Sequence, residues 1–260
     1  MKSERDGKVP VIEVVPDGVP GRTKAERVRA MFARIVPRYD LMNAVMTGGM
    51  DRHWRRAAVR AVTPVGGVAL DVGTGTGDLA LALIRGGAGE VIGVDFCEEM
   101  LAAAQAKARA AALSRVVSFL AADAAHLPFP DESFDCVVNG FLLRNVGDLR
   151  GALAEMARVL KPGGRLVCLE ITHPPPAFAP LFNLYFRHVV PLAGAVITGE
   201  GAAYRYLPVS LGPLPNAERL AALMTDVGLT DVHYRRLGLG TVALHVGNRS
   251  AVTVKENETN

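Results

Sequence analysis

The sequence has few of the features that mark secreted, zinc-binding or membrane-spanning proteins. Its three cysteines, Cys97, Cys136 and Cys168, lie far apart in apolar stretches, which excludes a disulfide scaffold and a zinc site built on paired cysteines. We therefore expect a reducing, cytoplasmic environment and interpret Cys136 and Cys168 as buried apolar residues. The first residues are charged and lack the apolar core of a signal peptide, and no apolar run reaches the roughly 18 residues of a membrane span.

An excess of one charge is also lacking over the chain as a whole. Lys and Arg number 29 against 26 Asp and Glu, a net charge of +3, so no nucleic-acid partner is expected. The cations are concentrated between Arg22 and Arg60, where ten Lys or Arg face three acids. One end of the chain is therefore basic.

Two helices are predicted in this basic segment. Thr23 and Glu26 form a capping box for the first, which Pro37 ends, and Asp51 is expected to cap the second. The apolar positions of the first helix recur at helical spacing and comprise Val28, Met31, Phe32 and Ile35.

From Val68 onward, short β-type runs alternate with helical stretches. Such alternation predicts a parallel sheet with helices on both faces. The expected strands are 68–72, 90–94, 116–121, 134–139 and 164–170, with 231–237 and 241–246 closing the chain. The expected helices are 77–85, 98–112, 148–160, 177–189 and 216–227. Residues 1–21 and 250–260 lack such patterns, so we expect both ends to be flexible.

A glycine-rich turn follows the first expected strand, where Asp71 precedes Gly73, Gly75 and Gly77. Glycine lets the chain turn tightly and lets N–H groups at a helix start approach a ligand. The third glycine comes too early for the dinucleotide fingerprint. The pattern D-x-G-x-G-x-G instead resembles the S-adenosylmethionine site of Rossmann-like methyltransferases. An anionic Asp71 suits a ligand with an ammonium group and a sulfonium better than it suits a pyrophosphate.

Acidic residues end the next two strands as well. Asp95 is placed to accept hydrogen bonds from two ribose hydroxyls, and Asp123 from an adenine amino group. Because parallel strands share one carboxyl edge, these acids should converge there. Each acid alone is also explained as a helix cap or surface residue, but together with the turn they predict a cofactor site. Its expected members are Asp71, Gly73, Gly75, Thr76, Asp95, Asp123, Ala124 and Gly140.

Further blocks, covering about residues 27–249, resemble the ubiquinone/menaquinone biosynthesis C-methyltransferases. The most specific are Tyr39-Asp40-Leu41-Met42-Asn43, Phe141-Leu142-Leu143-Arg144-Asn145-Val146 and Tyr204-Arg205-Tyr206-Leu207-Pro208. The sequence departs from that family at three places. Asp51 stands where many members have His, Leu142 where Gly is usual, and Thr172-His173-Pro174 where Ser-Lys-Pro is usual.

The resemblance implies both fold and reaction. The fold is α/β, a Rossmann-like class I methyltransferase with a seven-stranded, mostly parallel sheet, helices on both faces and an N-terminal helical lid. The lid is expected at 22–63 and the core at 64–249, with an acceptor-site insertion near 172–215. The implied reaction is S-adenosylmethionine-dependent C-methylation of a polyprenylated quinol, foremost demethylmenaquinol, without a metal.

That chemistry needs an oxyanion donor and a proton acceptor. Ionising a quinol hydroxyl, with a pKa of about 10, places negative charge on the adjacent ring carbon, so the site must favour the phenolate. Arg144 and Asn145 are the expected donors, with a structural salt bridge as the alternative role of Arg144. His173 is the expected base, with Tyr39 and Tyr204 as alternatives, and each of the three also has a purely structural interpretation.

A prenylated acceptor implies contact with a membrane, so we expect peripheral association with its inner face. The first basic helix is a hypothetical anchor to anionic lipid, unless its apolar residues pack on the domain. Its relevant cations are Arg27, Arg29 and Arg34. The segment 177–190 suits either an acceptor channel or core packing, through Phe178, Leu181, Phe182, Tyr185 and Val189.

Other functions stay open at this point. C-methylation of a methoxy-polyprenyl-benzoquinol in ubiquinone biosynthesis would use the same site. RNA methylation would use the same cofactor core with the basic helices, although the Asn/Asp-Pro-Pro-aromatic pattern of amino-directed enzymes is absent. The sequence specifies neither the prenyl length nor whether the chain forms a homodimer.

Overall fold

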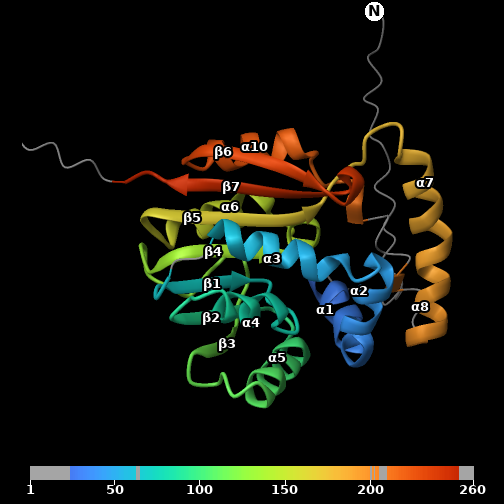
Figure 1. Cartoon of the computed structure of the whole chain (residues 1–260), viewed down its shortest axis with the longest axis horizontal. Helices are drawn as coiled ribbons and strands as arrows, with labels where there is room; N and C mark the ends of the chain where they lie inside the picture. The colour runs from blue at the N-terminus through green and yellow to red at the C-terminus, as the bar shows by residue number, and fades with distance from the viewer. Residues whose placement is uncertain (1–23, 63–64, 200, 202, 205–209, 252–260) are drawn as a thin grey trace, which may run out of the picture.

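The computed structural model describes residues 24–62, 65–199, 201, 203–204 and 210–251 (Figure 1). Several expectations fall outside these residues: the flexible end 1–21, most of the tail, Thr23 of the capping box and the positions after Tyr204 in its block. Within them, one seven-stranded sheet forms the centre of the fold.

The sheet follows the alternation seen in the sequence. Its strand order is β3-β2-β1-β4-β5-β7-β6. Neighbours from β3 to β5 are parallel, whereas β7 is antiparallel to β5 and β6, which confirms the mostly parallel sheet. The strands are β1 Val68–Val72, β2 Glu90–Asp95, β3 Val117–Ala121, β4 Phe134–Gly140, β5 Leu160–Ile171, β6 Leu229–Leu237 and β7 Val242–Arg249.

Helices cover both faces of this sheet, as parallel strands require. On one face α3 (Met50–Val62), α4 (Asp78–Arg85) and α5 (Glu98–Ala110) contribute to a single apolar cluster. On the other face α6 (Leu149–Arg158) and α10 (Ala217–Asp226) contribute to a second. The three cysteines are free and buried, as expected.

A third apolar cluster lies beyond the sheet edge, where the N-terminal helices meet the segment after β5. It joins α1 (Lys24–Ile35) and α2 (Tyr39–Thr47) to α8 (Val190–Thr198), and η1 (Val36–Arg38) connects the two N-terminal helices. The apolar residues of α1 pack here: Val28, Met31 and Ile35 are buried. The hypothesis that this face of α1 inserts into lipid is therefore wrong, and the alternative of packing on the domain is correct.

Asp51 does not cap the second helix, so that prediction is also wrong. The chain reverses between α2 and α3 through Gly48 and Gly49, whose φ angles are +58° and +76°. Because α3 already begins at Met50, Asp51 lies in its first turn. There its side chain accepts a hydrogen bond from the Thr47 hydroxyl at 3.0 Å.

The helix expected at 177–189 is longer than predicted. It consists of α7 (Ala179–Leu184), one π-helical turn η3 (Tyr185–Val189) and α8, and it stands at the edge of the molecule (Figure 1). Pro191 has no N–H group and its ring crowds the preceding turn, so a regular α-helix would break there. The π turn adds a residue just before this proline, and the helix continues to Thr198.

Candidate active site

The glycine turn connects β1 to α4 at the carboxyl edge of the sheet. Gly73, Gly75 and Gly77 have φ angles of +70°, +54° and +82°, a region that glycine adopts without strain. Gly73 also passes close to the loop after β4, because a Cβ atom at this position would lie 2.7 Å from a methyl carbon of Leu142. Only glycine fits there.

Asp95 ends β2 directly beside the turn. Its Oδ2 accepts a hydrogen bond from the Gly75 N–H at 2.8 Å, and its Oδ1 accepts one from the Cys97 N–H at 3.0 Å. Burial raises the pKa of Asp95, and the backbone donors act against that rise. Since a carboxylate offers about four lone-pair sites, Asp95 retains acceptor capacity toward the space that it lines.

Two cavities share Gly73, Asp95, Leu142 and Asn145 in their walls. The larger has a volume of about 300 Å³, and the smaller has a volume of about 40 Å³. We call them together the cofactor cavity. The structure brings seven of the predicted site residues to it: Gly73, Gly75, Asp95, Asp123, Ala124, Gly140 and Asn145.

Asp123 holds a more open position than Asp95. Its side chain is 67% exposed, and its Oδ1 accepts a hydrogen bond from the Ala125 N–H at 2.9 Å. Because exposed hydrogen bonds compete with water, Asp123 can contribute less than Asp95 to holding a ligand.

Asp71 and Thr76 lie behind the turn and do not line the cofactor cavity. The Oδ2 atom of Asp71 accepts a hydrogen bond from the Thr74 hydroxyl at 2.7 Å, and burial raises the pKa of Asp71 to about 7. The Thr76 hydroxyl donates to Asp40 at 2.6 Å. The side chains of these two predicted residues therefore support the turn from behind.

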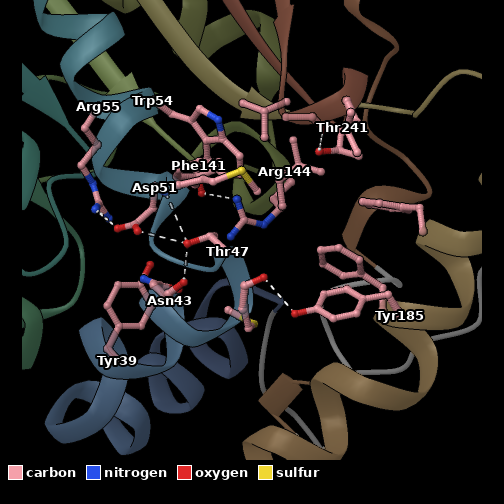
Figure 2. A pocket seen from close by; sticks show the side chains of 18 residues that line it. Tyr39, Asn43, Thr47, Asp51, Trp54, Arg55, Phe141, Arg144, Tyr185 and Thr241 are labelled. Carbon is pink, nitrogen blue, oxygen red and sulfur yellow. Dashed lines mark hydrogen bonds and ion pairs between the residues drawn. The ribbon is translucent and has the colours of Figure 1, made fainter. Parts of the chain in front are cut away.

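An apolar cavity of about 230 Å³ shares Tyr39 and Phe141 with the cofactor cavity (Figure 2). We call it the acceptor cavity. Its walls come from distant parts of the chain: the α2–α3 corner, the loop after β4, the end of β5, the α7–η3 helix and η4 (Gly238–Gly240) with the start of β7. Phe182 and Tyr185 line it, in agreement with the channel interpretation of 177–190, whereas Leu181 and Val189 are exposed.

Arg144 forms part of the acceptor-cavity wall. Its Nη1 lies 2.9 Å from the Glu170 Oε1 atom and also donates to the Phe141 carbonyl at 2.5 Å. The side chains of Arg144 and Glu170 are 6% and 1% exposed. Among the described residues, the buried Arg144 Nε has no hydrogen-bond partner. The guanidinium group is thus fixed by two acceptors and still has an N–H donor unmatched.

Asn145 lies in the wall of the cofactor cavity, close to Arg144. Its buried Oδ1 has no partner in the described part of the chain. Asn145 lines the cofactor cavity and also a small cavity of about 30 Å³ that Arg144, Tyr39 and Tyr204 border. Arg144, Asn145 and Tyr204 are therefore brought together near both cavities.

His173 is not brought to this site, contrary to expectation. It lies outside the walls of the cofactor and acceptor cavities and is exposed. Its backbone carbonyl accepts a hydrogen bond from Arg236 at 2.9 Å. Three prolines follow it, and their fixed φ angles lead the chain away from the sheet edge. Tyr39 and Tyr204 are the predicted bases that remain at the site.

The prediction missed Asp51, Asn43 and Trp54, which line the acceptor cavity. Asp51 is buried, and its second carboxylate oxygen pairs with Arg55 (Figure 2). The sequence did carry a signal, because Arg55 stands four residues after Asp51 and so shares its helical face. Its interpretation as a cap concealed that signal.

A charged cluster connects α2 to the glycine turn. The Lys107 Nζ atom lies 2.5 Å from Asp40 and 2.6 Å from Asp78, and it donates to the Thr76 hydroxyl at 3.0 Å. Arg55 of α3 lies 3.5 Å from the same Asp78. The helices that carry the acceptor-cavity residues are thus tied to the turn that borders the cofactor cavity. Within the described residues, no group of three or more His, Cys, Asp or Glu is placed to hold a metal ion.

Comparison with known sequences places the chain among methyltransferases. A model of the ubiE/COQ5 methyltransferase family matches residues 21–249. The demethylmenaquinone methyltransferase of Thermus thermophilus is 48% identical over 84% of this chain and 100% of its own. That of Deinococcus radiodurans is 47% identical over 87% and 94%. The ubiquinone/menaquinone biosynthesis C-methyltransferase UbiE of Desulfotalea psychrophila is 45% identical over 86% and 91%.

Solved structures show the same fold at low sequence identity. A SAM-dependent methyltransferase of Thermotoga maritima superposes with a TM-score of 0.62 at 22% identity, over 86% of this chain and all of that one. The [4+2]-cyclase SpnF superposes with a TM-score of 0.67 at 20% identity, over 90% of this chain and all of that one. Since a cyclase shares the fold, the fold alone does not determine the reaction.

Proposed function

This chain belongs to the ubiE/COQ5 methyltransferase family, and on that premise we propose that it methylates a ring carbon of the polyprenylated naphthoquinol demethylmenaquinol, with S-adenosylmethionine as the donor. The family membership makes the chain a methyltransferase. The particular acceptor follows from the relatives of highest identity named above, whose names state demethylmenaquinone.

The cofactor cavity fits S-adenosylmethionine in its donors and acceptors. The carboxylate of Asp95 would accept hydrogen bonds from the ribose hydroxyls, and the open backbone at Gly75 would lie against the ligand. Asp123 and Ala124 line the larger part of the cavity, where the adenine would rest. When bound, the donor supplies an electrophilic methyl group on a sulfonium.

The acceptor cavity suits an aromatic head group with an apolar tail. The rings of Trp54 and Phe141 lie 6.3 Å apart in its wall, and Phe182, Tyr185 and Phe186 form another side. The polar groups that reach it are few, chiefly Asn43, Asp51 and Arg144. A small number of polar groups in an apolar cavity fixes the orientation of a flat ligand.

Arg144 and Asn145 are proposed to hold the ionised quinol oxygen. The guanidinium of Arg144, which forms part of the cavity wall, would donate to the oxyanion, while Glu170 and the Phe141 carbonyl keep it in place. A well-aimed donor to an oxyanion contributes about 2.7 to 4 kcal/mol in the transition state. Negative charge on the ring carbon next to this oxygen makes that carbon the nucleophile.

Asp51 is proposed to accept the hydroxyl proton. It is the carboxylate that the structure places in the acceptor-cavity wall together with Arg144, and Thr47 and Arg55 hold it there. Arginine stays protonated in proteins, so Arg144 stabilises the anion and does not remove the proton. Tyr39 and Tyr204 then serve as walls of the cavity between donor and acceptor.

The enzyme is further proposed to work as a peripheral protein at the cytoplasmic face of the membrane. A polyprenyl tail partitions into the hydrocarbon of a bilayer, whereas the quinol head must reach the donor at the sheet edge. The protein must therefore meet its acceptor at the lipid surface.

The observation that carries this proposal is the buried Arg144, fixed by Glu170 in the wall of an apolar cavity that shares Tyr39 and Phe141 with the cofactor cavity. The test supplies methyl-labelled S-adenosylmethionine with demethylmenaquinol, with methoxy-polyprenyl-benzoquinol or with RNA. We expect the label in menaquinol. Preferential labelling of the benzoquinol would contradict the naphthoquinol acceptor and assign the enzyme to ubiquinone biosynthesis. Label in RNA alone would overturn the proposal.

A further inference from the structure

The helix that runs through α7, η3 and α8 is the most lipid-like element of the molecule. Ala179–Thr198 spans 20 residues and, in the described part of the chain, is the one helix long and apolar enough to cross a membrane. The expectation that no segment reaches that length is wrong for this helix. Only 17% of its apolar window is buried within the protein.

Large apolar side chains line the outward side of this helix. We define the outer face as Leu181, Leu184, Val189, Leu192 and Val196, which are 48% to 78% exposed. Helices on the surface of a water-soluble protein normally present polar side chains to solvent. A contiguous apolar stripe of this kind marks an interaction surface.

The π turn keeps these residues on one side of the helix. Leu181 and Leu184 are three residues apart, and Val189, Leu192 and Val196 follow at steps of three and four, as a helical face requires. The irregular step is the five residues from Leu184 to Val189, and it coincides with η3. A π turn takes up one extra residue, so the stripe continues from α7 into α8.

Charge around the outer face suits a lipid surface. Between Ile171 and Gly199 the chain contains no Asp or Glu. Its basic side chains there are His173, Arg187 and His188, and the last two are exposed within the π turn. A cation beside an apolar stripe is the arrangement of helices that lie in the interface between head groups and acyl chains.

The helix that carries the outer face also forms one wall of the acceptor cavity. Met50 and Leu239 line the cavity and are also 49% and 72% exposed, so they mark its opening to solvent. Phe182 and Tyr185 belong to the same helix as the outer face and line the cavity. Figure 2 shows the ring of Tyr185 in this wall. A tail that leaves the cavity here emerges next to the apolar stripe.

We propose that the outer face of α7–η3–α8, together with Met50 and Leu239, inserts into the acyl-chain boundary of a phospholipid bilayer, so that the acceptor's tail passes from the cavity into lipid without crossing water. This inference rests on the proposed prenylated acceptor. The helix lies in the membrane plane and does not span it. Its inner side packs on the domain through Val190, and Gly194 meets the ring of Tyr204.

The test measures co-flotation with neutral phosphatidylcholine vesicles in the absence of any acceptor. Leu192→Glu/Val196→Glu changes two exposed side chains and should lower the vesicle partition coefficient by about a hundredfold, because each buried aliphatic side chain accounts for at least a factor of about ten. Val65→Glu is the matched control, since Val65 is 91% exposed in the turn before β1, at the opposite end of the strands. Calorimetric S-adenosylmethionine binding verifies that each variant is folded.

The proposal is supported if the wild-type and Val65→Glu proteins bind vesicles and the double variant does not. Equal flotation of all three proteins overturns it, and so does failure of the wild type to bind. If the wild type is a dimer that does not bind vesicles, and the double variant is a monomer, then the outer face contacts a second copy of the chain. That result also overturns the proposal.

A parallel assay separates this test from the proposed function: on a quinol without a tail, the double variant should turn over like the wild type. Absence of turnover in every protein refutes the function alone.

Discussion

The Nη1 atom of Arg144 lies 2.9 Å from the Oε1 atom of Glu170, and both side chains are buried. Glu170 stands near the end of β5, and Arg144 follows the neighbouring strand β4. Sheet pairing therefore sets the position of the carboxylate before any ligand arrives. A buried ion pair of this kind adds little net stability, but it orients the cation that faces the acceptor cavity.

Replacing Arg144 with Ala should separate methyl transfer from donor binding. We expect S-adenosylmethionine affinity to change by less than about threefold and kcat to fall by about two decades or more, because the lost donor acts on the oxyanion. Arg165→Ala, at an exposed position of β5, is the matched control. If turnover on demethylmenaquinol persists and only the free energy of unfolding falls, Arg144 is a structural ion-pair residue.

Asp51→Asn should lower kcat by about two decades while leaving donor affinity intact, since an amide cannot take up the quinol proton. Thr47→Val removes the 3.0 Å hydrogen bond to Asp51 but keeps the carboxylate, so its kcat should fall much less. Steady-state kinetics on both variants make the comparison. Equal activity of Asp51→Asn and the wild type would show that Asp51 is not the proton acceptor, and Tyr39 or Tyr204 would then be the candidates.

Asp95→Asn should weaken S-adenosylmethionine binding by about one to two decades, because charge-assisted hydrogen bonds to the ribose contribute about 1.5 to 3 kcal/mol. The amide can still accept one of the two backbone hydrogen bonds that fix the loop. Titration calorimetry measures the effect, with Asp131→Asn at an exposed ion pair as control. Unchanged affinity in a folded Asp95→Asn protein rules out the ribose assignment.

Asp71 should make the stability of the fold depend on pH. Burial raises its pKa from 3.8 to about 7, so the native state binds more protons than the unfolded state between these values. The free energy of unfolding therefore falls as pH rises through this window, by up to about 1.4 kcal/mol per pH unit from this group. Asp71→Asn cannot titrate, so its stability relative to wild type should increase between about pH 5 and about pH 7. Parallel urea-denaturation curves that keep a constant offset would contradict this.

Much of the fold could be predicted from the sequence because strand and helix periods are local properties. The bounds of β1 agree with the prediction, and α4, α5 and α6 begin within one residue of it. The continuation of the helix past Pro191 could not be predicted, because a proline normally ends a helix and the compensating π turn leaves no pattern in the sequence. Likewise, Asp51 fits the sequence rule for a helix cap. In the structure the chain turns at Gly48 and Gly49, so the helix begins one residue before Asp51, at Met50.

The cofactor cavity and the acceptor cavity also differed in how well their residues could be predicted from the sequence. The predicted cofactor residues follow strand ends, and parallel strands align those ends, so the placement of Gly73 and Asp95 at one cavity could be predicted from their positions alone. The acceptor cavity needs Trp54 beside Gly238, a contact between opposite ends of the chain that no local pattern encodes. His173 shows the converse error, because following a strand end does not determine where a side chain points.

The assembly of the acceptor cavity from both ends of the chain has a consequence for synthesis on the ribosome. The described residues that line the cofactor cavity lie between positions 32 and 148, so these emerge before β5 is complete. The wall supplied by Gly238, Leu239 and Thr241 arrives only with the last strands, when β7 inserts between β5 and β6. A nascent or prematurely terminated chain therefore carries the described lining of the cofactor cavity, but it lacks one wall of the acceptor cavity. The proposed methyl transfer therefore needs a nearly complete chain.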